Sequence, residues 1–485
     1  MKEKNNNNAG LLILITAFIA VFAVLTWIVP AIGTYGADLD TAVRSQVGLS
    51  KLFTMPIEGI SMTLLYQTVG FILAVGGFYG VLKATGIYEK LVNTVKEKFL
   101  GKEKLLLIVI MILVALISTI TGLELGLLFI FPILIAIILA LGYDKIVAIS
   151  ATAGATLIGM YGSIFAGNMM LPASNLGLGV MDEIIARIVL FVLGLGVLIF
   201  FTLTHAKKNF KPEVKVSAKK DTKEKVKKEE VKEDKKSKRS IWPAAIFIDL
   251  VLILFVLGTT VWGFIFNVET TWFDTIHTKL MEVKVFDTFI FAQLFDGFTA
   301  FGTWALNDAY LMYTSVILIT TIVLAVTYKV KIKDAFAAFI DGAKDFLMPA
   351  VLTILAFSVL VFAHYFPIGR YVGTVVMNIT DNFNLATASI TTMLTALIGP
   401  DFQYYVGEVL YYFSELADKE IYPLLIVMVT SLHSLVMLVA PTGIVLLNVL
   451  AITDEKYSNW LKFIWKVFLV LLGISLAVLA VLWLI

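Results

Sequence analysis

The sequence predicts an all-α integral membrane protein of about ten transmembrane helices, built from two inverted repeats, each with a re-entrant hairpin and a broken helix. The first observation is composition. Hydrophobic residues make up 59% of the 485 positions and charged residues 15%, whereas soluble domains have roughly 45–50% and 25%. The second is the recurrence of apolar runs near the roughly 20 residues that span a bilayer. The third is a shared order of runs and breaks in the two halves of the chain.

The first apolar stretch runs from Gly10 to Ile32, after Lys2, Lys4 and an Asn run. It is longer than the apolar core of a signal peptide and has no obvious small-residue cleavage site. We therefore expect a retained first helix with its N-terminus in the cytoplasm, in a multi-pass protein of the cell membrane. The sequence contains no cysteine, which excludes disulfides, thiolate metal sites and cysteine nucleophiles.

A Lys-rich stretch from His205 to Ser240 divides the membrane part in two. It holds 15 Lys or Arg residues against 7 Asp or Glu and almost no apolar residues. Such a segment cannot bury enough surface to fold alone, and its basic excess predicts a cytoplasmic position. We expect a first membrane half at residues 1–205, a cytoplasmic linker at 206–240 and a second membrane half at 241–485. A headgroup-binding or regulatory role for the linker stays open.

Basic residues in the other loops predict their sides of the membrane. The segment 83–104 carries six lysines, and four more lie between residues 329 and 344, which predicts that both segments are cytoplasmic. Three segments with few basic residues are expected outside: 34–59, 267–308 and 366–383.

These sides give the two copies opposite orientations. Repeat 1, about 61–205, and repeat 2, about 345–485, each contain a span, an amphipathic loop, an apolar hairpin and an interrupted helix. The hairpins are broken near 119–124 and 399–403, and the interrupted helices lie at 143–174 and 421–450. Inverted repeats of this kind are characteristic of secondary transporters. Accidental symmetry in a polytopic protein is the alternative.

The breaks indicate where a substrate binds. Irregular backbone at membrane depth is tolerated where it is buried in protein or lines a cavity, and it offers free N–H and C=O groups and helix-dipole ends to a ligand. The candidate substrate-binding residues lie at the two hairpin tips and beside the two helix breaks: Thr121, Gly122, Glu124, Gly159, Gly162, Asn168, Asp401, Gln403, His433, Pro441, Thr442 and Gly443.

Glu124 and Asp401 occupy equivalent tips of the two predicted hairpins. An ionisable residue within a membrane costs about 3 kcal/mol and is a functional hypothesis by default. Together the two carboxylates favour a cationic group, a coupling proton or a sodium ion. The alternative is that each lies in a wet vestibule or pairs with a structural partner. His433 is a candidate proton relay or a hydrogen-bonded structural residue.

Several stretches resemble the YfcC-like family, described as basic amino-acid antiporters or C4-dicarboxylate anaerobic carrier-like proteins. They occur in the family's order: Trp27-Ile-Val-Pro30, Gly76-Gly-Phe-Tyr-Gly80 with Thr85-Gly86, Gly342-Ala-Lys-Asp345, and Pro441-Thr-Gly443 followed by Tyr457 and Trp460-Leu-Lys-Phe463. The resemblance implies the ion transporter superfamily fold, which agrees with the two inverted repeats inferred from charge.

The chain departs from the family pattern at the predicted site. The acidic hairpin motif falls on Gly122-Leu-Glu124, but Leu125 stands where a second acid is expected. Asn168-Met-Met is the nearest match to an NPF element, and His433 stands where an acidic residue is expected. The second hairpin tip, Gly399-Pro-Asp-Phe-Gln403, replaces a PSGSG-type sequence.

The leading hypothesis is a secondary carrier or exchanger of amino acids that works by alternating access, with cationic ones such as arginine or ornithine favoured. A dicarboxylate or peptide-like anion carrier is the alternative, and a channel or receptor is a third. The sequence has no phosphate-binding loop and no HExxH or G-x-S-x-G motif, so we expect neither an ATP-driven pump nor an enzyme.

We expect a small-molecule substrate, lipid contacts and, by analogy, a homodimer. We expect no cofactor beyond a coupling Na⁺ or H⁺, and no nucleic-acid partner.

Overall fold

The computed structural model describes residues 6–60, 63–210, 239–306 and 309–484. Ten helices in this part of the chain are long and apolar enough to cross a membrane. The predicted all-α membrane fold with about ten spans is therefore confirmed. Residues 211–238, which form most of the predicted linker, lie outside the described residues.

The first half contains ten α-helices, two 3₁₀ turns and one π-helical segment. In chain order these are α1 (Asn6–Ile28), η1 (Leu39–Thr41), α2 (Leu49–Ile60), α3 (Thr63–Ala84), α4 (Ile87–Lys98), α5 (Glu103–Thr121), η2 (Leu125–Phe129), α6 (Phe131–Ala140), α7 (Lys145–Ile149), the π-helical η3 (Ser150–Gly154), α8 (Ala155–Gly162), α9 (Gly167–Asn175) and α10 (Ile184–Asn209).

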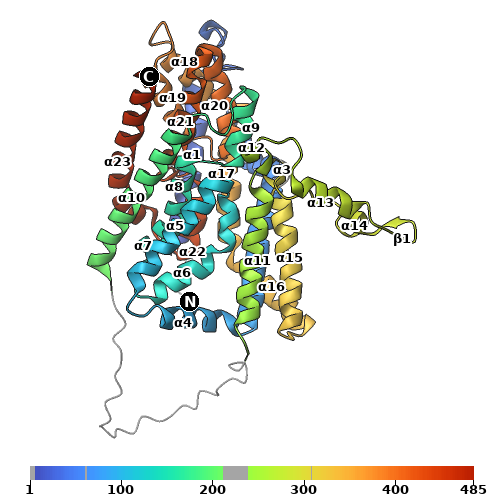
Figure 1. Cartoon of the computed structure of the whole chain (residues 1–485). Coiled ribbons are helices and arrows are strands. Elements are labelled where there is room, and N and C mark those ends of the chain that lie inside the picture. Colours follow the sequence, from blue (N-terminus) through green and yellow to red (C-terminus); the bar gives the residue numbers. More distant parts are fainter. Residues whose placement is uncertain (1–5, 61–62, 211–238, 307–308, 485) are drawn as a thin grey trace.

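The second half starts with helices outside the predicted repeat and a short antiparallel pair of strands, in which Lys284 is opposite Phe289. The elements are α11 (Trp242–Thr259), α12 (Trp262–Phe266), α13 (Trp272–Met281), β1 (Lys284–Val285), β2 (Thr288–Phe289), α14 (Ile290–Leu294), η5 (Trp304–Leu306), α15 (Ala309–Thr327), α16 (Ile332–Asp345), α17 (Leu347–Tyr365), α18 (Ile368–Met377), α19 (Leu385–Ala396), α20 (Phe402–Leu416), η6 (Lys419–Ile421), α21 (Tyr422–Met437), α22 (Ile444–Thr453) and α23 (Tyr457–Leu484). The segment α13–β1 projects sideways from the helix bundle (Figure 1).

The two ends of the described chain lie at opposite faces of the bundle (Figure 1). One face, which we call the N-terminal face, contains the start of α1, the helix α4, the end of α10 and the start of α11. The end of α23 and the helix α18 lie at the other, which we call the C-terminal face.

The inverted repeats are visible in the order and direction of the helices. Helix α3, amphipathic α4, the α5–α6 hairpin, the broken helix α7–α9 and α10 are followed in the same order by α17, α18, the α19–α20 hairpin, the broken helix α21–α22 and α23. The two series run in opposite directions, since α4 lies at the N-terminal face and α18 at the C-terminal face (Figure 1). An amphipathic helix also precedes each series, α2 before α3 and α16 before α17.

The hairpins differ from the prediction in one respect. The α5 arm, with 19 residues, is long enough to span a bilayer, whereas α6 has 10 residues. The apolar pieces on either side of residues 118–124 looked too short in the sequence to be full spans, and this interpretation was wrong for α5. In the second hairpin α19 has 12 residues and α20 has 15.

Local sequence explains several helix ends. Proline lies in the first turn of α6, α11 and α21, where its missing N–H costs nothing. Gly122 ends α5 at φ +76°, a conformation that side chains disfavour. Asp144 and Asn384 cap α7 and α19 through their side-chain oxygens.

Candidate functional site

The tip of the first hairpin is an ordered turn. The N–H of Gly122 donates to the Ser118 carbonyl oxygen at 2.8 Å. The Thr121 hydroxyl accepts a hydrogen bond from the Leu123 N–H at 2.9 Å and donates one to the Ile117 carbonyl. Glu124 follows directly at the start of η2 and is partly buried. Thr121, Gly122 and Glu124 therefore lie at this tip, as predicted.

Hydrogen bonds join this tip to the first broken helix. The Ser118 hydroxyl donates to the Thr156 carbonyl oxygen at 2.9 Å. The hydroxyl and the carbonyl of Thr119 accept the N–H groups of Ile164 and Phe165 at 3.1 and 2.9 Å. The hairpin thus supplies partners for backbone groups that the helix break leaves free.

The first break lies after the glycine run and not within it. Gly159 and Gly162 are inside α8, which ends at Ser163 with φ +41°. A Cβ on Gly159 would lie 2.5 Å from the Ala115 carbonyl oxygen, and one on Gly162 would lie 2.5 Å from Cβ of Phe191. The break therefore lies within the predicted interrupted helix at 143–174, but Gly159 and Gly162 themselves are helical, and they allow α8 to pack closely on α5 and α10.

Arg187 was missed by the sequence reasoning and caps this break. It is almost fully buried, and its guanidinium donates to the carbonyl oxygens of Ser163 and Ile164 at 3.2 and 3.1 Å, as well as to those of Val180 and Asp182. A charged residue in the apolar run of α10 was the signal that could have identified it. Asn168 lies in the first turn of α9, but its side chain is outside the described residues.

The second hairpin and the second broken helix are joined in a similar way. The Thr442 hydroxyl donates to the Leu397 carbonyl oxygen at 2.8 Å, and His433 Nε2 lies 2.8 Å from the Gly399 carbonyl oxygen. That contact requires a proton on Nε2, while buried Nδ1 has no partner among the described residues. This geometry favours the structural interpretation of His433.

The break itself falls where the sequence predicted, between the end of α21 at Met437 and the start of α22 at Ile444. It contains Pro441 and Thr442. A side chain on Gly443 would lie 2.7 Å from the Met437 carbonyl oxygen. Gln403 lies nearby in the first turn of α20, partly buried.

The two hairpin tips each carry a carboxylate, and the charges of the two interact. Asp401 caps α20, and its Oδ1 accepts the Tyr404 N–H at 2.7 Å. The charge of Asp401 interacts unfavourably with that of Glu124. The charges of both acids also interact with Tyr310 of α15. Glu124 makes no hydrogen bond to a described residue, and its side chain is only partly buried. The arrangement is a like-charged pair that a cation would stabilise.

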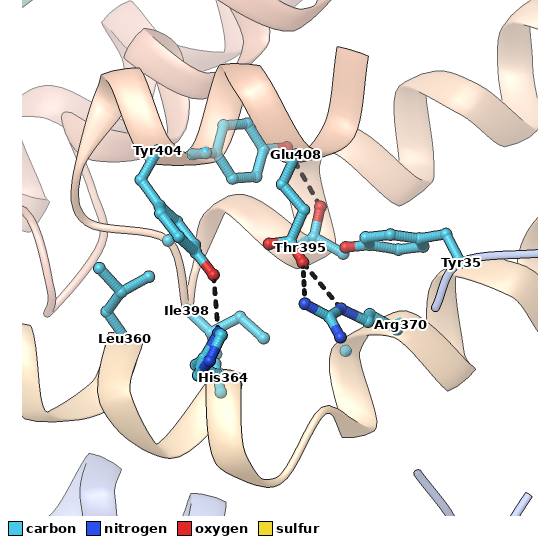
Figure 2. A pocket seen from close by; sticks show the side chains of 12 residues that line it. Tyr35, Leu360, His364, Arg370, Thr395, Ile398, Tyr404 and Glu408 are labelled. Carbon is cyan, nitrogen blue, oxygen red and sulfur yellow. Dashed lines mark hydrogen bonds and ion pairs between the residues drawn. The ribbon is translucent and has the colours of Figure 1, made fainter. Parts of the chain in front are cut away.

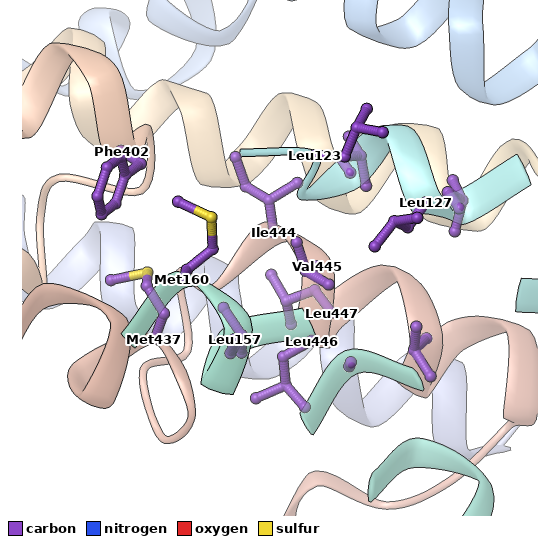
Figure 3. Packing of buried hydrophobic residues seen from close by; sticks show 14 of the residues in the cluster. Leu123, Leu127, Leu157, Met160, Phe402, Met437, Ile444, Val445, Leu446 and Leu447 are labelled. Atoms are coloured by element: carbon purple, nitrogen blue, oxygen red, sulfur yellow. The ribbon is translucent and has the colours of Figure 1, made fainter. Parts of the chain in front are cut away.

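Apolar side chains surround the centre between the tips. Leu123 and Phe402 come from the two hairpins, Met160 and Met437 from the two broken helices, and Ile444 from the start of α22. All five belong to one buried cluster (Figure 3). The centre therefore combines two acids with flexible and aromatic apolar groups.

A model of the family described as C4-dicarboxylate anaerobic carrier, DcuC, matches residues 10–484. The chain belongs to the DcuC family. An uncharacterized protein of Haemophilus influenzae is 28% identical over 159 residues, which is 31% of this chain and 31% of that protein. The chain also resembles the crystal structure of the YdaH transporter of Alcanivorax borkumensis, with 13% identity, a TM-score of 0.39, and coverage of 99% of this chain and 98% of that one.

Membership of the DcuC family makes this multi-pass membrane protein a carrier of a small molecule. The broader part of the predicted function is therefore confirmed. The narrower YfcC-like resemblance and the amino-acid substrate remain predictions.

A second polar cluster in this DcuC-family chain joins α17, α18 and α20 (Figure 2). Arg370 of α18 donates from Nε to Glu408 Oε1 of α20 at 2.7 Å and also donates to the Gly33 carbonyl. His364 of α17 lies 3.0 Å from the hydroxyl of Tyr404. These contacts connect the second hairpin to its neighbours, and the residues that make them line a small pocket. Because Glu408 is paired with Arg370, it is not a free acid beside Asp401.

Proposed function

We propose that this carrier transports amino acids, with cationic ones such as arginine or ornithine favoured, and that it binds them between the hairpin tips. The observation that carries the proposal is that the tips of both hairpins carry an acid, Glu124 and Asp401, whose like charges interact. Two carboxylates in a low-dielectric centre repel each other, and a bound ammonium or guanidinium group removes that repulsion.

Arg187, a buried cation of the first repeat, does not compensate these acids. Arg187 is held by four backbone carbonyls. In the second repeat Arg370 is engaged by Glu408 and Gly33. A cationic substrate therefore has a charge to meet at the tips, whereas an anion would be repelled there.

The helices that begin at the two breaks, α9 and α22, offer a binding site for the carboxylate of an amino acid. Helices α9 and α22 each begin at a break and run outward from it. First-turn N–H groups and the positive end of a helix dipole favour a carboxylate. The proposed pose thus places the substrate carboxylate near these helix starts, its stem against Met160 and Met437, and its cationic group at Glu124 and Asp401.

A C4-dicarboxylate is the second candidate, because the DcuC family carries that description. In this alternative the acid pair holds protons or sodium ions that are co-transported with the dianion. Acidic pH or sodium would then stimulate uptake of the dicarboxylate, and arginine would not compete.

Uptake into proteoliposomes tests the two candidates. Labelled arginine and labelled succinate are offered to the wild type, to Glu124→Gln and to the exposed-surface control Glu97→Gln, which lies on α4. We expect arginine uptake by the wild type and the control, and loss of at least tenfold in Glu124→Gln. Arginine uptake unchanged in Glu124→Gln would contradict the role of the acid pair. Uptake of succinate alone would favour the second candidate.

We also propose that the N-terminal face is cytoplasmic. The lysines of α4 and the Lys-rich segment before α16 lie at that face, as the bias of Lys and Arg toward cytoplasmic loops requires. Labelling of a cysteine placed at Glu97 tests this, since the chain has no native cysteine. Labelling by an impermeant reagent in intact cells would contradict the proposed side.

A further inference from the structure

Tyr310 lies close to the first hairpin tip, on a helix outside the hairpins and the broken helices. It lies in the first turn of α15. Helix α15 packs on the first hairpin near its tip, since a Cβ on Gly126, two residues after Glu124, would lie 3.2 Å from the Tyr313 ring. Tyr310 is one helical turn from Tyr313, and the two ring centroids are 5.7 Å apart. Glu124 and Asp401 both act electrostatically on Tyr310.

The hydroxyl groups of these two neighbouring tyrosines have different surroundings. The Tyr313 hydroxyl is hydrogen-bonded to Thr259 of α11 at 2.6 Å. The Tyr310 hydroxyl has no hydrogen-bond partner among the described residues. It is also not one of the described polar atoms that are both buried and without a partner, so it is not fully enclosed by protein. A tyrosine in an apolar environment usually finds a partner for its hydroxyl. An open hydroxyl beside two acids is therefore free to contact a ligand.

The ring of Tyr310 is held in place although its hydroxyl has no hydrogen-bond partner among the described residues. Its centroid is 5.5 Å from that of Phe71 on α3, and Phe71 also contacts Phe255 of α11. The ring is thus fixed by α3 and α15, and little conformational entropy is lost when the hydroxyl forms a hydrogen bond.

Helix α15 contacts the first hairpin through Tyr313, but the side-chain hydrogen bonds of the two belong to separate groups of helices. Thr119 and Ser118 connect the first hairpin to the first broken helix by hydrogen bonds. In the described chain, the side-chain hydrogen bonds of α15 stay within α15 or go to Thr259 of α11. Alternating access moves such groups relative to one another. A contact from α15 to a substrate at the tips is therefore made in one access state.

We propose that Tyr310 is a substrate-contacting residue whose hydroxyl oxygen accepts an N–H of the substrate's ammonium or guanidinium group while Glu124 and Asp401 hold that group's charge. This inference rests on the proposed function. It adds a specificity for cations that carry N–H donors, because the Tyr310 hydroxyl oxygen can accept a hydrogen bond only from a substrate that has such a donor. It also adds sidedness, because the contact exists only when α15 faces the tips.

The test compares Tyr310→Phe with Tyr313→Phe in proteoliposomes of known orientation. Initial rates of labelled arginine transport are measured with substrate on each face separately. We expect Tyr310→Phe to raise KM about tenfold at one face, the size expected for a hydrogen bond to a charged group, with little change in kcat. Tyr313→Phe, which loses a hydrogen bond to Thr259, is expected to lower Tm without a one-sided change in KM.

The outcomes separate this inference from the proposed function. If Glu124→Gln abolishes arginine transport while Tyr310→Phe matches the wild type at both faces, the role of Tyr310 is overturned and the proposed function stands. Equal KM changes at both faces would also overturn the one-sided contact. Absence of arginine transport in the wild type would overturn both.

Discussion

A Cβ atom on Gly76 of α3 would lie 2.6 Å from the carbonyl oxygen of Gly342 on α16. The approach is mutual, because a Cβ on Gly342 would lie 2.7 Å from Cα of Gly80. The two glycine-containing stretches that resemble the YfcC-like family therefore pack directly on each other. Their backbones meet where α3 of the first repeat crosses the amphipathic helix before the second.

Gly76→Ala should destabilise the protein strongly, because backbone atoms cannot move aside as a flexible side chain can. Overpacking typically costs about 1–3 kcal/mol. Gly70→Ala on the same helix is the matched control, since nothing lies within 4 Å of its Cβ position. It should be neutral or slightly stabilising, because alanine is the better helix former. Thermal unfolding in detergent measures both, and equal Tm values would contradict the close approach.

The pair Arg370–Glu408 gives a second prediction. Arg370 contacts both Glu408 and the Gly33 carbonyl, whereas Glu408 contributes one partner. Arg370→Gln should therefore cost more than Glu408→Gln, at about 1–3 kcal/mol, between the values for exposed and buried pairs. The exchange Arg370→Glu with Glu408→Arg should recover part of the loss. Additive losses in the exchanged variant, measured by thermal unfolding, would show that the pair is not coupled.

The spans, the two hairpins and the second break could be predicted because they follow from apolar run length and from Gly399, Pro400 and Pro441. The first break lies within the predicted stretch 143–174, but Gly159 and Gly162 were interpreted as helix breakers and instead lie inside α8. Inside a membrane bundle, glycine also permits close helix packing, and the two roles have the same local sequence. Tyr310 could not be predicted, since its position beside Glu124 depends on how α15 packs on the first hairpin.

A third prediction concerns Asn448, whose Nδ2 donates to the hydroxyl of Thr353 on α17 at 2.9 Å. Asn448→Leu and Thr353→Val should show a coupling energy of about 0.5–2 kcal/mol in a double-mutant cycle, the range for interhelical hydrogen bonds in membranes. The exposed contact of Asn459 with Glu455 provides the comparison, and Asn459→Ala should change Tm little. Zero coupling between Asn448 and Thr353 would contradict a stabilising hydrogen bond.

The last prediction concerns pH and the pair Asp144–His205 at the N-terminal face. Asp144 Oδ2 lies 2.8 Å from His205 Nε2, and its Oδ1 accepts the Val147 N–H at 3.0 Å. Burial raises the pKa of the Asp144 carboxyl, but these hydrogen bonds outweigh burial and hold its pKa below the usual value of 3.8. A depressed pKa means that the ionised carboxylate stabilises the folded state above the unfolded pKa, and that this contribution is lost as the pH falls through the folded value.

Asp144→Asn isolates this contribution, because asparagine caps a helix about as well as aspartate but carries no charge. The wild type should therefore melt at a higher temperature than Asp144→Asn at pH 5 and above. The difference should shrink as the pH falls below about 4, first through the unfolded pKa and then through the depressed folded pKa of Asp144. Differential scanning fluorimetry across pH 3 to 8 measures both proteins. A Tm difference that grew in acid would have the wrong sign for a depressed pKa, and it would show that the Asp144 carboxylate does not stabilise this end of α7.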